Sequence, residues 1–527
     1  MTARRHVATT ARLATVLLAV LAPWRLDAQS LSPRDSALHA LNRLAFGPRP
    51  GEVDRVAGLG VMRWIDQQLE PERVPDDRLA ERERAFKLLD LGREELALRY
   101  GDALRERREM QRNMAASGDT ARRPGAGPMR EFRQLGGELQ QLAVVRAALS
   151  ERQLREVMVD FWTNHFNVFV GKGADRFLTP SYIEQTIRPH ALGRFEDLLI
   201  ATAQSPAMLF YLDNAQSIAP GSVPPMRGRR PDRMPQGINE NYARELLELH
   251  TLGVDGGYTQ QDVIAVARIL TGWGIERPQQ GAGFTFRDWA HDRGEKTVLG
   301  VRFPGGHGMD EGVRLLKLLA NQHATMHHVS RKLCARLVAD EPPDGCVDAA
   351  VDAWHRTNGD IRAVLRAIVA APDFWAPQVL HAKVKTPFEF VVSAVRATGA
   401  EPDDTPRLAQ VVARLGQPLY LQPAPTGYPE TQAQWVNSGA LLGRMNVAVA
   451  LAAGRLPGVT TNLDAVVPLT ADRSQLTDLV NGRVLSGTMT AHTRDVIRRQ
   501  LADVNDPMQA RALAVGLAIG GPEFQRQ

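Results

Sequence analysis

Apolar residues recur at three- and four-residue intervals along most of this 527-residue chain, and this spacing constrains the fold more than any other feature. It is the period of an amphipathic helix with one face toward a core. The segments that show it are residues 32–55, 61–69, 136–170, 179–203, 239–252, 259–273, 309–319, 327–338, 360–371 and 387–398. No regular strand–helix alternation and no fixed-period repeat accompanies them. The sequence therefore predicts a mainly α protein, a large multi-helix globular domain with a minor β-hairpin.

Two of these segments begin with residue patterns typical of helix starts. Thr386, followed by Pro387 and then Glu389, predicts a capping box with proline at the first helical position. Thr259 with Asp262 predicts a similar start. Strand signals are weaker: residues 284–287 and 296–301 flank a polar turn, which predicts that these two segments pair as one hairpin.

The first 28 residues have the pattern of a secretory signal peptide. Arg4, Arg5 and Arg12 precede an apolar run at residues 13–22, and Ala28 offers a small residue for cleavage. About 20 apolar residues are needed to span a bilayer, and no later segment supplies them. We therefore expect an exported, soluble protein, periplasmic or extracellular. The paired arginines leave both the general secretory and the twin-arginine routes open.

The formal net charge of +5 overstates how basic the mature chain is. Residues 1–28 hold four arginines and one aspartate, a net of +3, which leaves +2 for the remainder. A chain this close to neutral lacks the basic surface that binds nucleic acid, so a nucleic-acid partner is not expected.

By composition the chain divides into three parts. Residues 1–28 are the predicted signal peptide, residues 29–458 form the main helical domain, and residues 459–527 form a C-terminal helical extension that packs on it. Within the main domain, residues 105–129 and 216–237 have little apolar surface to bury, which predicts flexible insertions. The second insertion directly precedes the 239–252 helix, so it is either a lid or a slack insertion.

The chain contains two cysteines, Cys334 and Cys346, and no zinc-binding spacing. In an exported protein this pair is a candidate disulfide. Closing the short loop between them would add about 3 kcal/mol to the stability of the fold on the loop-entropy argument. Two buried free thiols are the alternative.

The stretch "DFWTNHFNVF", residues 160–169, mixes polar groups into an apolar helix. Wound as a helix, it places His165 on the core face with neighbouring aromatic side chains, while Asp160, Asn164 and Asn167 form an adjacent polar stripe. Buried polar groups need hydrogen-bond or metal partners. Those partners must come from elsewhere in the chain.

The best candidate partners lie in "NENYARELLELHTLG", residues 239–253. Asn241, Glu245 and Glu248 share one helix face, and His250 lies on another. Carboxylates one turn apart can ligate a divalent metal, although they also form structural ion pairs. Because a buried imidazole and buried carboxylates can each supply what the other lacks, we predict that His165 lies within about 6 Å of Glu245 or Glu248.

A third polar group is His291 with Asp292, placed in the predicted hairpin turn. Adjacent His and Asp can ligate a metal or act as an acid–base pair, but a turn also favours Asp for its own backbone hydrogen bonds. The sequence contains no nucleophile-elbow, P-loop, HExxH, dinucleotide-binding or haem-attachment motif. These absences argue against a serine hydrolase, a nucleotide enzyme or a zincin.

Several long motifs together resemble one bacterial family. They are "HALNRLAFGPRPGEVDRV" (39–56), "FWTNHFNVF" (161–169), "NENYARELLELHTLGVDGGYTQQDV" (239–263), "LTGW" (270–273), "HD" (291–292) followed by "KTVLG", and "KVKTPFEFVV" (383–392). The chain is similar in these motifs to the family called domain of unknown function 1800. The resemblance implies an exported, mostly helical protein, often encoded beside a sulfatase-like secreted family. It implies no activity, cofactor or catalytic residue.

Two functional hypotheses follow. In the first, the chain is an extracytoplasmic enzyme, and its candidate catalytic residues are His165, Glu245, Glu248, His291 and Asp292. A divalent metal, such as Fe, Mn, Zn or Ca, would be held by His165, Asn241, Glu245 and Glu248. In the second, the chain is a non-catalytic cell-envelope partner or scaffold that acts with a sulfatase-like protein. An open cleft at the polar groups would favour the enzyme, and a filled core would favour the partner.

Overall fold

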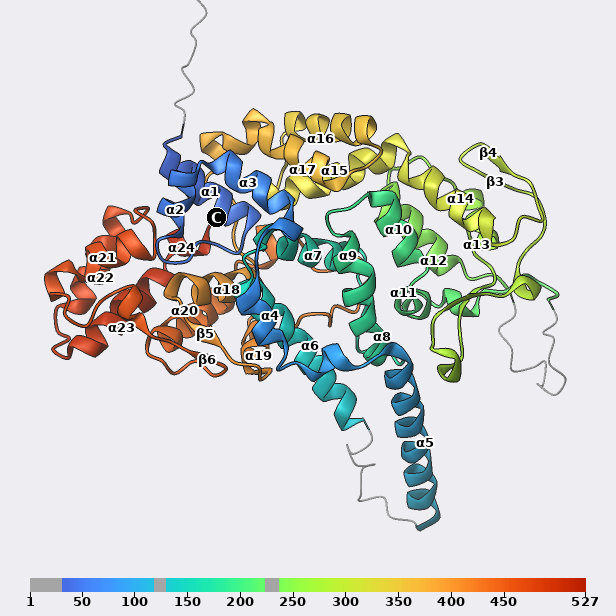
Figure 1. The fold of residues 1–527 in the computed structure, drawn as a ribbon, viewed down its shortest axis with the longest axis horizontal. Helices are drawn as coiled ribbons and strands as arrows, with labels where there is room; N and C mark the ends of the chain where they lie inside the picture. The colour runs from blue at the N-terminus through green and yellow to red at the C-terminus, as the bar shows by residue number, and fades with distance from the viewer. Residues whose placement is uncertain (1–30, 118–128, 223–236) are drawn as a thin grey trace, which may run out of the picture.

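The computed structural model describes residues 31–117, 129–222 and 237–527, and helices dominate these ranges, as predicted (Figure 1). The predicted signal peptide and most of the 216–237 insertion lie outside the described residues. The first half of the helices comprises α1 (Pro33–Leu44), α2 (Glu52–Leu59), α3 (Val61–Leu69), α4 (Asp77–Glu83), α5 (Arg93–Ser117), α6 (Arg130–Leu149), α7 (Gln153–His165), α8 (Asp175–Ser181), α9 (Arg188–His190), α10 (Phe195–Ala203), α11 (Pro206–Tyr211) and α12 (Glu240–Glu245).

The second half comprises α13 (Gln260–Ile269), α14 (Met309–Ala320), α15 (His323–Leu337), α16 (Asp344–Thr357), α17 (Ile361–Ala370), α18 (Pro387–Thr398), α19 (Arg407–Arg414), α20 (Ser438–Ala452), α21 (Leu476–Arg483), α22 (Ala491–Leu501), α23 (Pro507–Gly520) and α24 (Pro522–Gln525). Helix α7 lies near the middle of the molecule, α10 to α14 gather at one end, and α20 to α24 gather at the other (Figure 1). Within the described residues, no helix combines the length and apolarity needed to cross a membrane.

Helix starts follow the capping signals in the sequence. Thr386 and Glu389 form the predicted capping box of α18, and Thr259 and Asp262 form that of α13. The long segments break where local chemistry requires it. Residues 136–170 form two helices, because the backbone at Ser150 turns to an extended conformation between α6 and α7.

The predicted hairpin is wrong in its pairing. The strands β2 (Phe284–Phe286) and β3 (Lys296–Val298) do not pair with each other; β2 pairs with β1 (Trp273–Ile275), and β3 pairs with β4 (Val301–Phe303). The reason is a tight turn at Leu299 and Gly300, which both have positive φ, +49° and +76°. Such a turn folds β4 directly back onto β3. A third short pair joins β5 (Glu401–Pro402) and β6 (Val459–Thr460).

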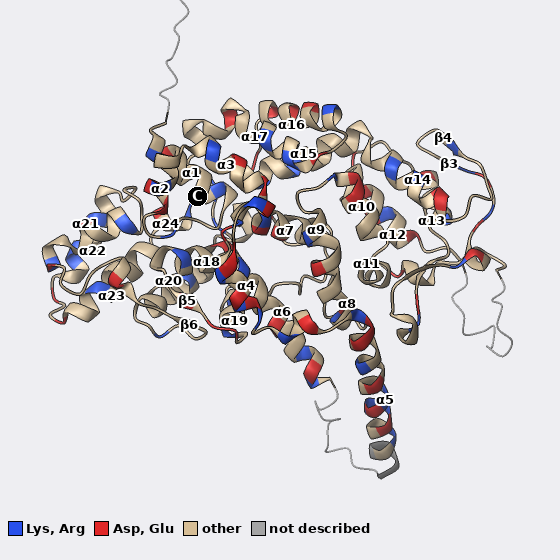
Figure 2. Ribbon diagram, viewed as in Figure 1, with Lys and Arg blue, Asp and Glu red and all other residues tan. Residues whose placement is uncertain are grey.

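Within the first predicted insertion, residues 105–117 continue helix α5, which projects from the body beside the end of α6 (Figure 1). Arg, Glu, Met and Ala are good helix formers, so a segment with little to bury can still be helical. Oppositely charged side chains alternate along α5 (Figure 2), and Arg99 pairs with Glu95 one turn away. Residues 118–128 lie outside the described ranges.

Residues 459–527 pack on the rest of the chain mainly through α23, which lies along α20. Gly516 and Gly520 permit this close approach: a Cβ at Gly516 would lie 3.0 Å from the Val449 backbone, and one at Gly520 would clash with the sulfur of Met445. The last residues then pair with the segment before α18, through backbone hydrogen bonds from Lys385 to Gln525.

Helices α15 and α16 are joined covalently. Cys334 of α15 and Cys346 of α16 form a disulfide, with Cα atoms 6.3 Å apart. Both residues are buried, so the bond lies inside the core. It fixes α15, the helix that supplies two cations to the polar centre described next.

Candidate functional site

Helix α7 carries a stripe of polar side chains into the centre of the molecule. Glu156, Asp160 and Thr163 follow one another at four- and three-residue spacing, and Asn164 and Asn167 extend the stripe. This spacing keeps them on one face of the helix. The stripe faces α6, α15 and an irregular segment at residues 417–431, which we call the 417–431 loop.

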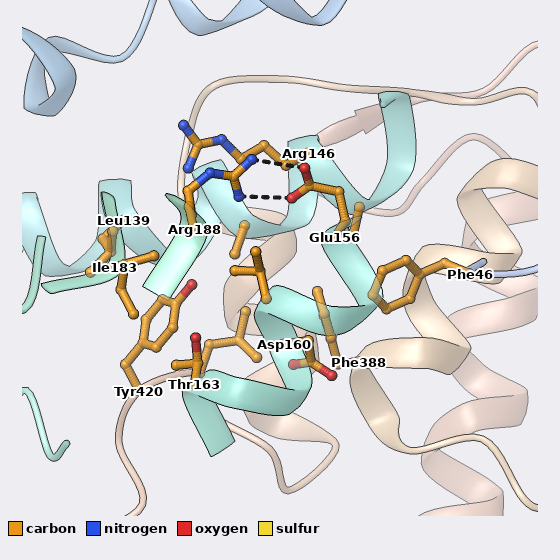
Figure 3. A pocket seen from close by; sticks show the side chains of 14 residues that line it. Phe46, Leu139, Arg146, Glu156, Asp160, Thr163, Ile183, Arg188, Phe388 and Tyr420 are labelled. Atoms are coloured by element: carbon orange, nitrogen blue, oxygen red, sulfur yellow. Dashed lines mark hydrogen bonds and ion pairs between the residues drawn. The ribbon is translucent and has the colours of Figure 1, made fainter. Parts of the chain in front are cut away.

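Two small adjoining cavities lie along this stripe and share Asp160, Thr163, Leu419 and Tyr420 in their walls. We call the pair the Asp160 chamber. Figure 3 shows the first cavity, with Glu156 and its arginine partners at one end and Asp160, Thr163 and Tyr420 at the other. Each cavity has a volume of about 40 Å³. That volume holds about one to three water molecules.

One arginine organises the charges at the chamber. Arg336 of α15 lies 3.2 Å from Asp160, 2.9 Å from Glu389 and 3.4 Å from Glu430. Burial raises the pKa of Asp160 to about 7; Arg336 opposes the rise, while the charges of Glu430 and Glu389 add to it. Asp160 is therefore an acid that exchanges its proton near neutral pH.

The far end of the first cavity is a second set of matched charges. Arg188 donates two hydrogen bonds to Glu156, at 2.8 and 2.9 Å, and Arg146 pairs with Glu83 and Glu184. Although burial alone would raise it, these arginines hold the pKa of Glu156 at about 2. Glu156 therefore stays ionised, unlike Asp160 one turn away.

The two asparagines of the stripe hold the 417–431 loop. Asn164 donates to the Tyr428 carbonyl at 2.8 Å and accepts from the Tyr428 amide at 2.6 Å. Asn167 donates to the carbonyls of Gln422 and Ala424 at 3.0 and 2.8 Å. The partners that the stripe required are thus backbone groups of a loop more than 250 residues away in sequence.

His165 is buried at the end of α7, and the structure gives it two partners, neither of which is Glu245 or Glu248. Lys332 Nζ lies 3.0 Å from His165 Nδ1, and the His250 carbonyl lies 3.2 Å from Nε2. An ammonium only donates, so Nδ1 accepts and Nε2 carries the proton that it donates to His250. Burial and the Lys332 charge lower the pKa of His165 well below its usual value. The ring is neutral, and neither nitrogen is left for a metal.

Sequence reasoning missed Lys332 and the nearby His328, whose Nε2 lies 3.3 Å from the Leu249 carbonyl. The one available signal was spacing, because Lys332 and Arg336 are four residues, about one turn, apart on α15. The π-helical turn η6 (Leu246–Thr251) buries His250.

The predicted stripe runs from α12 into the π-helical turn η6, with Asn241 exposed and Glu245 and Glu248 half-buried, and it makes separate local contacts. Asn241 donates to the Leu212 carbonyl at 3.4 Å, and Glu248 accepts from the Tyr258 hydroxyl at 3.2 Å. Burial and the Glu248 charge raise the pKa of Glu245. Glu240 and Arg244 form an i,i+4 ion pair at 3.6 Å.

His291 and Asp292 belong to a third set of contacts. The His291 Nδ1 lies 3.0 Å from the Thr271 carbonyl, and Asp292 pairs with Arg268 at 2.8 Å. Burial alone would raise the pKa of Asp292, but hydrogen bonds from Arg268 and from a backbone amide lower it. Asp292 is an ionised partner of an arginine, which differs from the acid–base role that the enzyme hypothesis gave it.

The structure therefore separates the candidate residues into three groups with their own partners. Among residues 31–117, 129–222 and 237–527, no cluster of three or more His, Cys, Asp or Glu side chains is arranged to hold a metal. The proposed set of His165, Asn241, Glu245 and Glu248 is not gathered around one point.

Comparison with known proteins gives one result. Residues 39–526 match the family described as "Protein of unknown function (DUF1800)". The chain belongs to this family. No curated protein and no solved structure matches it. The family resemblance seen in the motifs is thus confirmed over nearly the whole chain, and the function of the DUF1800 protein has to be argued from its own geometry.

A larger hollow in the described part of the DUF1800 chain is lined by none of the candidate site residues. It has a volume of about 670 Å³, and we call it the α20 groove. Its lining consists of Val384, Gln432, Ala433, Val436, Leu441, Met445, Gly520, Pro522, Gln525 and Arg526. Val436 and Leu441 are 43% and 40% exposed, and the adjoining Leu442 is 63% exposed. This surface could not be predicted from the sequence, because α20 has the composition of a core helix.

Proposed function

We propose that this DUF1800 protein is an exported ligand-binding protein of the cell envelope, and that the α20 groove is its ligand site. The groove itself carries the proposal. Its volume of about 670 Å³ falls within the roughly 300–1,000 Å³ range of small-molecule sites, which are mostly apolar with a few polar groups. Contiguous apolar side chains left exposed on a soluble protein mark binding sites.

Export is supported by two independent features. Residues 1–28 have the basic, apolar and small-residue order of a signal peptide. The Cys334–Cys346 disulfide suits an oxidising compartment outside the cytoplasm. N-terminal sequencing of the protein purified from its host envelope should start near Gln29. An intact Met1 would contradict export.

The polar groups support binding over metal catalysis. Both nitrogens of His165 are engaged, and Asp292 is matched by Arg268. The Asp160 chamber admits only water-sized molecules. His165, Asn164 and Asn167 are held by partners elsewhere in the fold, and buried polar groups held in this way fix a single packing arrangement, as the partner hypothesis requires.

A titration with a neutral, environment-sensitive fluorescent probe tests the proposal. The mature protein should bind the probe at one saturable site, because binding removes the apolar surface of the groove from water. Leu441→Glu should abolish binding by placing a charge in the groove. The matched control is Met508→Glu, which alters a side chain 65% exposed outside the groove. Equal binding by wild type and Leu441→Glu would overturn the proposal.

The family resemblance also supports a proposal about a protein partner. We propose that this DUF1800 protein acts on envelope material together with a sulfatase-like secreted protein. Co-expression of the two proteins, followed by affinity purification of either one, should recover both in a fixed ratio. Separate elution at micromolar concentration would remove this partner and leave the ligand proposal intact.

A further inference from the structure

The chemistry of the α20 groove is apolar on all sides except for a few polar atoms. Val436 and Leu441 supply one part of its wall, and Met445 and Pro522 supply another. Helix α20 contains a single charged residue, Arg444, which is buried. A ligand in this groove therefore needs a long apolar body to replace the water that now covers these side chains.

The charge in the lining of the α20 groove is positive. Among the described residues that line it, Arg526 alone is charged. Arg526 is exposed, no carboxylate pairs with it in the described part of the chain, and its one hydrogen bond, to the His381 carbonyl, is long at 3.5 Å. A guanidinium whose N–H donors are available can bind a carboxylate through its opposite charge and through two parallel hydrogen bonds.

A second cation lies directly behind the lining. Arg444 is 1% exposed, and its Nη1 lies 3.5 Å from the side-chain oxygen of Gln525, a lining residue. Its Nε and Nη2 have no hydrogen-bond partner among the described residues. Glu389 is the acid that acts on Arg444, but Glu389 also pairs with Arg336 at 2.9 Å. The groove wall therefore has an excess of positive charge.

We propose that the ligand of the α20 groove is a single-chain anionic amphiphile, a long-chain fatty acid, with its alkyl chain against Val436, Leu441 and Met445 and its carboxylate on Arg526. The inference rests on the proposed binding function and narrows it to one class of ligand. One open guanidinium matches one acid group. The apolar lining has no acid to repel it.

The test compares dodecanoate with dodecanol, which share a chain and differ in the head group, below the concentration at which either forms micelles. Calorimetric or displacement titration should show the acid binding at least about tenfold more tightly than the alcohol, the factor that a modest charge contact of about 1.4 kcal/mol gives. Arg526→Gln should remove that preference and leave the alcohol unchanged. Arg455→Gln, which alters an exposed arginine outside the groove, should retain it.

Each outcome separates this inference from the proposed function. Equal affinity of acid and alcohol, with the neutral probe still bound, would overturn the fatty acid and keep the groove as a binding site. Preference for a phosphatidic acid vesicle over dodecanoate would also overturn it, in favour of a lipid head group. Failure of the probe, the alcohol and the acid alike would overturn both proposals.

Discussion

The Asp160 chamber and the α20 groove lie on either side of one short stretch of chain. Tyr428 and Glu430 line the chamber, while Gln432 and Val436, a few residues later, line the groove. The chamber is dense in charges and has room for little more than water. The groove is about 670 Å³ in volume and has one charged side chain in its lining.

The difference between these two regions shows where ligand capacity resides. Buried charges must be paired as the protein folds. In the cluster of Arg336 with Asp160, Glu389 and Glu430, the charged groups therefore bind one another and are not available to a ligand. Exposed apolar side chains have no partner within the fold. The chamber therefore contributes to folding, and the groove is left available for binding.

The largest expected effect comes from removing the central cation of the chamber. Arg336→Met should lower the free energy of unfolding by about 3–5 kcal/mol, because it leaves Asp160, Glu389 and Glu430 without the cation that they share. Urea denaturation measures the loss. The control is Arg302→Met, which breaks a fully exposed pair with Glu295 and should leave the free energy of unfolding nearly unchanged. Equal losses in the two variants would show that the chamber is not a folding centre.

The next effect comes from the disulfide, which fixes α15 and thus the cations of the chamber. Its cysteines are 12 residues apart, and Cys334→Ser with Cys346→Ser should lower the free energy of unfolding by about 3 kcal/mol. Binding of the neutral probe to the α20 groove should persist at temperatures where the variant remains folded. Loss of probe binding when the disulfide is removed would show that the α20 groove depends on the chamber, which would contradict the distinction between the two regions.

His165→Ala should cause a smaller loss of stability, again in the polar core and not in the α20 groove. It removes the acceptor of Lys332 and the donor to the His250 carbonyl, and should cost about 1–3 kcal/mol of unfolding free energy. Metal content, measured by elemental analysis of the purified protein, should be the same in wild type and variant. A bound metal lost with His165 would restore the metal-site hypothesis.

The titration of Asp160 predicts a pH dependence of stability. Burial raises its pKa to about 7 in the folded state, against about 3.9 unfolded. The folded state thus keeps a proton that the unfolded state releases, so this stabilisation is full below about pH 4 and is lost as the pH rises through 7. Asp160 is 25% exposed, and with solvent screening we expect about 1–2 kcal/mol.

Denaturation of wild type and Asp160→Asn between pH 4 and 8 checks this sign. The stability of the variant relative to wild type should rise across that window, because the variant has no proton to lose. A relative stability of Asp160→Asn that falls with pH would contradict the assignment.

The smallest stability effect is expected in the groove. Leu441→Glu should change the free energy of unfolding by less than about 0.5 kcal/mol, because the side chain is 40% exposed and supports little of the core. Its effect should fall on ligand binding instead. A loss of several kcal/mol would mean that Leu441 is a folding residue.

The sequence predicts local structure here better than it predicts partners. The capping boxes at Thr259 and Thr386, and the burial of His165, follow from residue spacing alone. The partner of His165 does not, because Lys332 is 167 positions away and belongs to no motif. The pairing of β2 failed for a related reason, since its partner β1 precedes it in a segment that reads as helix.

The two hollows differ in how far they could be predicted. The polar stripe on α7 can be predicted from the sequence, because burying Asp160 and Asn164 is costly unless they have partners. The sequence does not show which loop supplies those partners. The α20 groove gives no such signal. Leu441 and Val436 have the pattern of core residues, and only the three-dimensional fold shows that nothing in the described chain covers them.

The most direct test of the account is one binding experiment on two variants. Dodecanoate is titrated into Leu441→Glu and Asp160→Asn, with wild type alongside and the fold of each protein verified by circular dichroism. We predict that binding is lost in Leu441→Glu and retained within about twofold, less than 0.5 kcal/mol, in Asp160→Asn. Binding retained in Leu441→Glu and lost in Asp160→Asn would contradict the assignment of the ligand site to the α20 groove.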